Sequence, residues 1–162
     1  MSRHSRAGGN PGEPKVLKIK GTSMGIKIHV PLKSQVINGG FVVQIVGQGI
    51  KWSTHQLGKY AKSKGVYIYH SKGEILYVGN TTGTKMNFGM RLRRECQERA
   101  AGNSKLHQDF RRLKSDVCVF LLDLDAVNRM VDAKPSGLDD KRKALILEQI
   151  LIGIFNPRFN RQ

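Results

Sequence analysis

A single acidic residue interrupts an apolar stretch near the end of the chain. Glu148 is the one carboxylate between Ala144 and Ile154. An ionised carboxylate among apolar neighbours costs free energy unless it is paired or binds a metal, and one carboxylate with waters suits Mg²⁺. The alternative is a glutamate that faces solvent from the polar side of an amphipathic helix.

Two tyrosines flank a predicted hairpin. Gly65-Val66-Tyr67 is followed by Tyr77-Val78-Gly79, with a polar tip at 70–74 between them. The β-branched and aromatic residues favour strands, and Gly73 permits the positive φ that a tight turn needs. We expect Tyr67 and Tyr77 to lie across from each other on paired strands, with both hydroxyls on one face. In the alternative interpretation these hydroxyls cap a hydrophobic sheet face.

A basic helix is predicted after the hairpin, from Met90 to Ala100. Its arginines are Arg91, Arg93, Arg94 and Arg99. Arg91 and Glu95 are four residues apart and therefore share a helix face. A second basic helix is predicted from Ser104 to Lys114.

The remaining pattern completes an α+β fold, with a small antiparallel sheet flanked by helices. Strands are predicted at 16–20, 25–30, 41–46 and 116–124. Further helices are predicted at 53–63, capped by Ser53, and at 139–155, capped by Asp139 or Asp140. Residues 125–140 are expected to form a polar loop with a short helical start.

The composition indicates a polyanionic partner. The 162 residues carry 28 Lys and Arg against 12 Asp and Glu, a net charge of +16. Such a charge favours nucleic acid first and an anionic membrane surface second. No apolar run approaches the ~20 residues of a membrane span. Cys96 and Cys118 make no disulfide framework, so we expect reduced thiols and a cytoplasmic protein.

The end of the chain resembles a known nuclease module. Leu147 to Ile152, followed by Asn156-Pro157-Arg158-Phe159-Asn160, is similar to the end of the GIY-YIG module of excision-repair nucleases. There a helix glutamate precedes an asparagine by twelve residues, the interval between Glu148 and Asn160. The two tyrosine triplets resemble the motifs that name this family, with Val in place of Ile, and Arg91 follows on the next helix.

The resemblance covers 64–162 and implies roles for matching residues in phosphodiester hydrolysis. Tyr67 is expected to be the general base for water, and Tyr77 to hydrogen-bond the phosphate or the water. Arg91, with Arg93 as the alternative, would bind non-bridging phosphate oxygens through its planar guanidinium. Glu148 would hold one Mg²⁺, or Mn²⁺ in its place, and Asn160 would fix the geometry.

The sequence departs from the family pattern at two positions. Asn80 stands where repair enzymes often carry lysine, and Glu95 stands where relatives often have tyrosine or histidine. The group that poises Tyr67 therefore stays open. Its candidates are Lys72, Lys85, His70 and His107.

The resemblance implies a Mg²⁺-dependent DNA endonuclease, similar to the type II restriction enzymes of this family. Such enzymes act on double-stranded DNA as homodimers or higher homo-oligomers. We expect a flexible basic arm at 1–14, a β-rich extension at 15–63 that binds DNA or forms a dimer, and the nuclease module at 64–162. The residues expected to contact DNA are Lys72, Lys85, Arg93, Arg94, Lys105, Arg111 and Arg112.

Three alternatives belong to other classes or other biological settings. One is a phage or mobile-element nuclease, and another is a DNA-binding module without catalysis. A basic protein of the membrane surface ranks lowest, because no strongly basic amphipathic helix with a bulky apolar face stands out.

Overall fold

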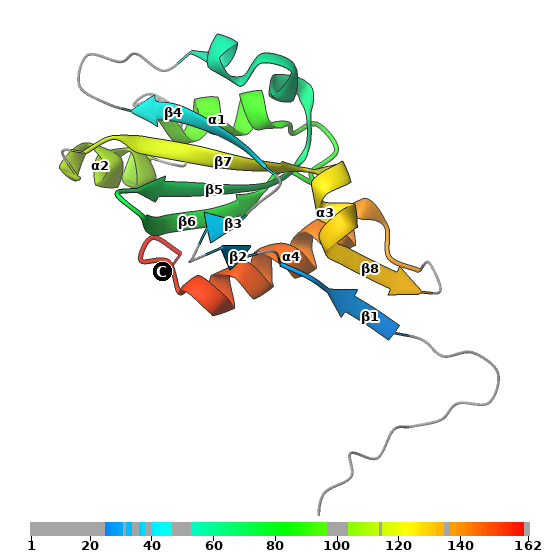
Figure 1. The fold of residues 1–162 in the computed structure, drawn as a ribbon. Coiled ribbons are helices and arrows are strands. Elements are labelled where there is room, and N and C mark those ends of the chain that lie inside the picture. The colour runs from blue at the N-terminus through cyan, green and yellow to red at the C-terminus, as the bar shows by residue number, and fades with distance from the viewer. Residues whose placement is uncertain are drawn as a thin grey trace, which may run out of the picture.

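A four-stranded antiparallel sheet forms the centre of the molecule, with helices on both faces (Figure 1). The computed structural model describes residues 25–30, 32–33, 36–37, 40–46, 53–96, 104–113, 115–134 and 137–160. The strand order is β4 (Phe41–Val46), β7 (Val117–Asp123), β5 (Gly65–Ser71), β6 (Glu74–Asn80). This arrangement confirms the α+β class and the small antiparallel sheet. The predicted arm at 1–14 and the strand at 16–20 lie outside the described residues.

Strands β5 and β6 form the predicted hairpin, with a two-residue turn at Lys72-Gly73. Both turn residues have positive φ, 47° and 81°, as the hairpin turns that match strand twist require. The register differs from our expectation, because Tyr77 lies opposite Tyr69, and Tyr67 lies opposite Gly79. Since directly opposed residues share a face, the three tyrosines still project from the same side of the sheet.

A β-bulge at Leu76 accounts for the residues that β6 buries on this side. Tyr69 pairs with Tyr77 while His70 pairs with Ile75, so Leu76 is the extra residue. Leu76 and Tyr77 consequently both pack on the tyrosine side, whereas Ile75 packs on the other. The bulged carbonyl of Leu76 accepts a hydrogen bond from the Phe159 amide, at 3.0 Å.

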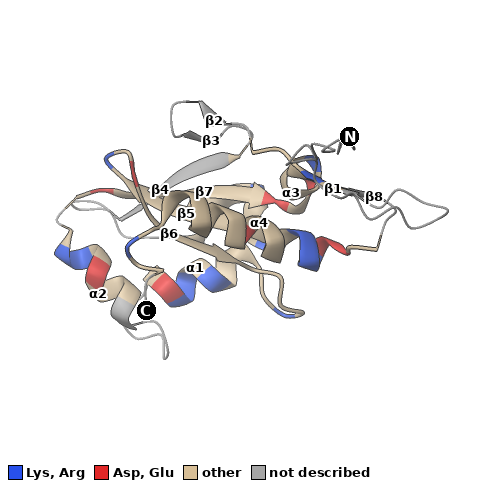
Figure 2. Cartoon of the chain, turned by 90° about the horizontal axis from the view of Figure 1, so that it is seen from below, with Lys and Arg blue, Asp and Glu red and all other residues tan. Residues whose placement is uncertain are grey.

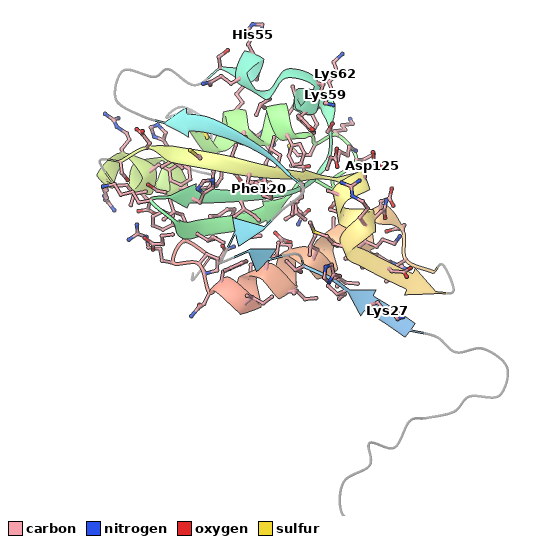
Figure 3. The ribbon with its side chains drawn as sticks, viewed as in Figure 1. Lys27, His55, Lys59, Lys62, Phe120 and Asp125 are labelled. Carbon is pink, nitrogen blue, oxygen red and sulfur yellow. The ribbon has the colours of Figure 1, made fainter. Side chains whose placement is uncertain are left out.

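The tyrosine face of the sheet is covered by three helical segments (Figure 1). They are η1 (Thr54–Lys62), α1 (Phe88–Cys96) and α2 (Ser104–Arg112). Leu57, Phe88 and Phe110 are among the buried residues that these segments contribute. The predicted helix at 53–63 is instead a 3₁₀ segment that kinks at Gly58, with φ of 51°, although Ser53 caps it as expected. His55, Lys59 and Lys62 point outward from it (Figure 3).

The opposite face is covered by α3 (Leu124–Met130) and α4 (Asp140–Phe155). Val66, Ile68 and Phe120 meet Ala144, Leu147 and Leu151 of α4 there. Asp139 caps α4, as one of the two predicted candidates. Of the polar loop with a short helical start expected at 125–140, α3 confirms the helical start, but the strand β8 (Val131–Lys134) follows it where a loop was expected. Burial of Ala126, Val127 and Val131 stabilises these short elements beyond their local propensity.

Strands of the expected N-terminal extension join elements of the C-terminal part. β4 pairs with β7 in the central sheet, and β1 (Gly25–Ile28) pairs with β8. β2 (Leu32–Lys33) and β3 (Val36–Ile37) pair with each other. The described part of 15–63 thus contributes strands to the same sheets as the rest of the chain, and the boundary at 63/64 does not separate two sheets.

The glycines of the two triplets are needed for close packing. Gly65 has φ of 152°, and a Cβ there would lie 1.9 Å from the carbonyl oxygen of Leu122. A Cβ on Gly79 would lie 2.4 Å from the hydroxyl oxygen of Tyr67. The absence of a Cβ at Gly79 therefore allows the Tyr67 ring to pack against strand β6.

The packing at Gly79 predicts opposite effects for two alanine substitutions. We expect Gly79→Ala to lower the free energy of unfolding by about 1–3 kcal/mol, because the added methyl group overlaps Tyr67. Gly153→Ala is the matched control, since nothing lies within 4 Å of its Cβ position in α4. It should raise the free energy of unfolding by about 0.5–1 kcal/mol. Denaturant titration measures both, and equal effects would contradict the packing described here.

Candidate functional site

Glu95 lies at the centre of a buried hydrogen-bonded cluster. It is on α1, and its side chain is 1% exposed. The Tyr67 hydroxyl donates to its Oε1 at 2.6 Å, and the Tyr69 hydroxyl donates to its Oε2 at 2.8 Å. The sequence placed Glu95 on the same helix face as Arg91, but contained no sign that it would meet two tyrosines of β5.

Arg91 reaches this cluster from one turn earlier on α1. Its Nε lies 2.7 Å from Oε1 of Glu95 and donates to the Tyr67 hydroxyl at 2.9 Å. The Arg91 side chain is 31% exposed, so it connects the buried cluster to the surface. Arg93 is exposed on the same helix. The geometry therefore favours Arg91 over Arg93 as the arginine of the site.

Burial dominates the electrostatics of the cluster. It raises the pKa of the Glu95 carboxyl, while Arg91 and the two tyrosine hydroxyls oppose that rise. Burial and the neighbouring Glu95 raise the pKa of Tyr67 and of Tyr69 well above the ordinary value. Both phenols therefore stay protonated and donate to the carboxylate at neutral pH.

Tyr77 lies at the outer side of the tyrosine group. Its ring centroid is 6.1 Å from those of Tyr67 and Tyr69, and the residue is half-buried. Burial raises the pKa of the Tyr77 hydroxyl, and Glu95 and Glu148 add to the rise. The nearby positive charge of Arg91 lowers this pKa. Tyr77 thus interacts with charged groups from both helical layers.

Glu148 projects from α4 toward the end of β6. The side-chain amide of Asn80 donates to its Oε2 at 2.6 Å, and the carboxylate is half-buried. Burial raises the pKa of Glu148, whereas the Asn80 hydrogen bond and the charge of Arg91 lower it. The solvent-facing alternative for Glu148 does not fit these contacts, since the side chain is paired at the sheet edge.

The donors around Glu148 limit the kind of metal that it can hold. Among the described residues, no group of three or more His, Cys, Asp or Glu side chains converges on one point. Asn80 turns its amide nitrogen to Glu148 and its oxygen to Thr82. A single carboxylate fits Mg²⁺, which keeps several waters, and does not fit a metal that requires a complete protein cage.

Asn160 binds the segment that follows α4 to strand β6, at the outer edge of the sheet. Its side-chain oxygen accepts from the Val78 amide at 2.8 Å, and its side-chain nitrogen donates to the Val78 carbonyl at 2.8 Å. At Val78, the side-chain amide therefore makes the hydrogen bonds that a neighbouring strand would otherwise make. Phe155 packs with the α4 side of the sheet and Phe159 with the tyrosine side, so this segment crosses the edge of β6.

The general-base role expected for Tyr67 conflicts with its surroundings. The residue is 0% exposed, and Arg91 and Glu95 occupy its hydroxyl. A raised pKa also disfavours the phenolate that a general base needs. Of the candidates to poise Tyr67, His70 follows Tyr69 on β5 and therefore projects to the opposite face. The groups that bond the Tyr67 hydroxyl are instead Glu95 and Arg91.

The basic residues expected to contact DNA occupy separate elements. Lys72 is exposed in the hairpin turn and Lys85 in the loop before α1. Arg93 and Arg94 are exposed on α1, and Arg111 and Arg112 on α2. Lys105 lies on α2, but its side chain is outside the described part. Figure 2 shows Lys and Arg on α1 and α2, which contact each other beside the sheet.

Comparisons with protein-family models, curated proteins and solved structures find no match. None of the helices in the described ranges is long and apolar enough to cross a membrane. Cys96 and Cys118 are free, on α1 and β7, as expected.

The two hydrogen bonds between the Asn160 side chain and the backbone of Val78 predict a stabilising role for Asn160. We expect Asn160→Ala to lower the free energy of unfolding by about 1–3 kcal/mol, because the Val78 amide and carbonyl lose their partners. Gln108→Ala removes an exposed amide side chain from α2 and should change stability by less than about 0.5 kcal/mol. Denaturant titration compares the two variants. Equal stabilities would show that Asn160 does not hold the edge of the sheet.

Proposed function

We propose that the chain is a metal-dependent DNA endonuclease with a GIY-YIG-like site. One observation carries the proposal: Arg91 from α1, Tyr77 from β6 and Glu148 from α4 lie near one edge of the sheet. Arg91 donates to the Tyr67 hydroxyl, whose ring lies 6.1 Å from that of Tyr77, and Glu148 accepts a hydrogen bond from Asn80 at the end of β6. A guanidinium, a phenol and a carboxylate at an open edge form a set suited to a phosphodiester. The match of Glu148 and Asn160 to the family interval supports the same function.

The protein groups would divide the work of hydrolysis. Arg91 binds non-bridging oxygens of the scissile phosphate and stabilises the charge that accumulates there in the transition state. Tyr77, which is half-buried beside Tyr67, would hydrogen-bond the phosphate or the attacking water. Asn80 orients the Glu148 carboxylate through its hydrogen bond. Asn160 keeps β6, and hence Tyr77, in place.

Glu148 would hold Mg²⁺, or Mn²⁺ in its place. When bound, the ion supplies positive charge that favours departure of the 3′-oxygen. Glu148 is half-buried and so retains contact with solvent, as a hydrated cation requires.

Basic residues on the tyrosine side would track the DNA backbone. Arg93, Arg94, Arg111 and Arg112 are exposed on the two neighbouring helices. They place positive charge on the layer that carries Arg91, where phosphates would be bound. A type II restriction endonuclease acting as a homodimer or higher homo-oligomer is the specific form we propose, because one such site cuts one strand.

A DNA-binding module without catalysis is the second candidate. The complete burial of Tyr67 favours it, since the tyrosine that would activate water in the family has no access to solvent. The two candidates differ in one measurement, namely metal-dependent strand cleavage.

Removal of the Glu148 charge tests the endonuclease directly. Supercoiled plasmid is incubated with Mg²⁺ and either the unmodified protein or Glu148→Gln. We expect nicked and linear products from the former, and a loss of cleavage of at least about 100-fold in the latter with DNA binding retained. Glu74→Gln removes the same charge from the exposed hairpin and should cleave normally. Binding without cleavage by the unmodified protein would favour the second candidate.

The basic helices predict a salt dependence for DNA affinity. Replacing Arg93 and Arg94 by alanine should weaken binding and reduce the slope of log K against log salt by about 1 for each phosphate that is no longer neutralised. The matched control removes two exposed charges from α4, on the other layer, by K141A/R142A. Fluorescence anisotropy with a labelled duplex across a salt series measures the slopes. An equal decrease in both variants would contradict a DNA-binding face at α1.

A further inference from the structure

The ion pair inside the cluster is not explained by stability. Moving two charges out of water costs free energy that their mutual attraction often fails to offset. Glu95 nevertheless lies among buried residues, with its two oxygens against the hydroxyls of Tyr67 and Tyr69 and the guanidinium of Arg91. An acid paired in this way constrains the groups around it.

The contacts of Glu95 constrain one group that reaches the surface. Its Oε1 accepts a hydrogen bond from the Tyr67 hydroxyl and forms an ion pair with the Nε of Arg91. Its Oε2 accepts a hydrogen bond from the Tyr69 hydroxyl. Tyr67 in turn accepts from the same Nε. The carboxylate is therefore fixed by strand β5, and the inner side of the guanidinium is fixed by the carboxylate. Tyr69 is itself wedged against Phe110, with ring centroids 4.8 Å apart.

We propose that Glu95 is a positioning residue, which with Tyr67 and Tyr69 holds Nε of Arg91 so that its terminal nitrogens face the phosphate. The proposal rests on the endonuclease function and assigns Tyr67 to the support of Arg91. Tyr77, on the exposed side, is then the tyrosine that meets the substrate. A planar guanidinium held at Nε keeps its paired terminal donors available to two phosphate oxygens.

The contacts of Glu95 give a reason for a carboxylate at position 95, where the family that the chain resembles often has tyrosine or histidine. A hydroxyl or imidazole would offer Arg91 a single hydrogen bond of fixed direction. The carboxylate accepts hydrogen bonds from two phenols, and its negative charge forms an ion pair with the guanidinium of Arg91. Misplacement of a catalytic group by about 1 Å can cost roughly 100-fold in rate, so this restraint affects catalysis without contacting substrate.

Kinetics of three variants test the positioning role. We expect Glu95→Gln to lower kcat by about 10–100-fold while the Kd for DNA changes by less than about threefold, because the other exposed arginines of α1 and α2 still bind the backbone. Tyr67→Phe should lower kcat by about tenfold, through loss of one support, and Tyr77→Phe should lower it further. Glu74→Gln is the matched control for charge and should retain the unmodified rate. Cleavage by Glu95→Gln at the unmodified rate would overturn the proposal.

A spectroscopic measurement separates support from direct participation of Tyr67. The ¹⁵N resonance of Arg91 Nε should be visible and protected from exchange in the unmodified protein, and absent or shifted in Glu95→Gln and Tyr67→Phe. If Tyr67→Phe is as inactive as Tyr77→Phe while this resonance is unchanged, Tyr67 itself reacts and the proposal fails. If Glu95→Gln does not fold, Tyr67→Phe carries both measurements.

Failure of the endonuclease function would be distinguishable. With a short DNA duplex and no metal, the terminal nitrogens of Arg91 should shift in the unmodified protein but not in Glu95→Gln. That result without any cleavage by the unmodified protein would leave Glu95 as the support of a phosphate-binding arginine and remove the hydrolytic function. Equal shifts in both proteins would overturn the proposal, whatever the cleavage activity.

Discussion

The carboxylate of Glu95 is ionised only at a cost, and the surrounding structure is arranged to reduce it. Three donors from α1 and β5 converge on its two oxygens, and each fixes the position of an element that contributes to the site. Strand β5 presents Tyr67 and Tyr69 on one face because they are two residues apart. Helix α1 presents Arg91 and Glu95 together because they are four residues apart. The site thus depends on the two-residue repeat of strand β5 and the four-residue spacing on helix α1, which together bring their side chains to the Glu95 carboxylate.

The second half of the site is organised by the exposed edge of β6. An edge strand leaves backbone donors and acceptors unpaired, and the segment after α4 satisfies them through Asn160 and Phe159. The same segment carries the chain from the α4 side of the sheet to the tyrosine side. Because α4 also packs along β6, Glu148 meets Asn80 where that strand ends. Asn160 therefore acts on the site through the position of the strand.

The two halves of the site contain both buried and half-buried side chains. Glu95 and Tyr67 are buried, whereas Arg91, Tyr77 and Glu148 are half-buried and form the rim of the site. Buried members have raised pKa values and keep their protons or pairs, so they suit a structural role in the site. Groups at the rim remain available to solvent and ligands. The proposed division between supporting and reacting residues follows from this order of burial.

Local sequence was sufficient to predict the hairpin, the helix caps and the shared face of Arg91 and Glu95, because these depend on propensity and spacing. Ser53 and Asp139 cap their helical segments as predicted, and the triplets form β5 and β6. The partner of each tyrosine emerged only in the folded chain, since the bulge at Leu76 shifts the register near the turn. Packing also determined that Glu95 is buried beneath two phenols and that β4 joins the central sheet. Those contacts join residues far apart in the chain, and no local pattern specifies which distant surface a side chain will meet.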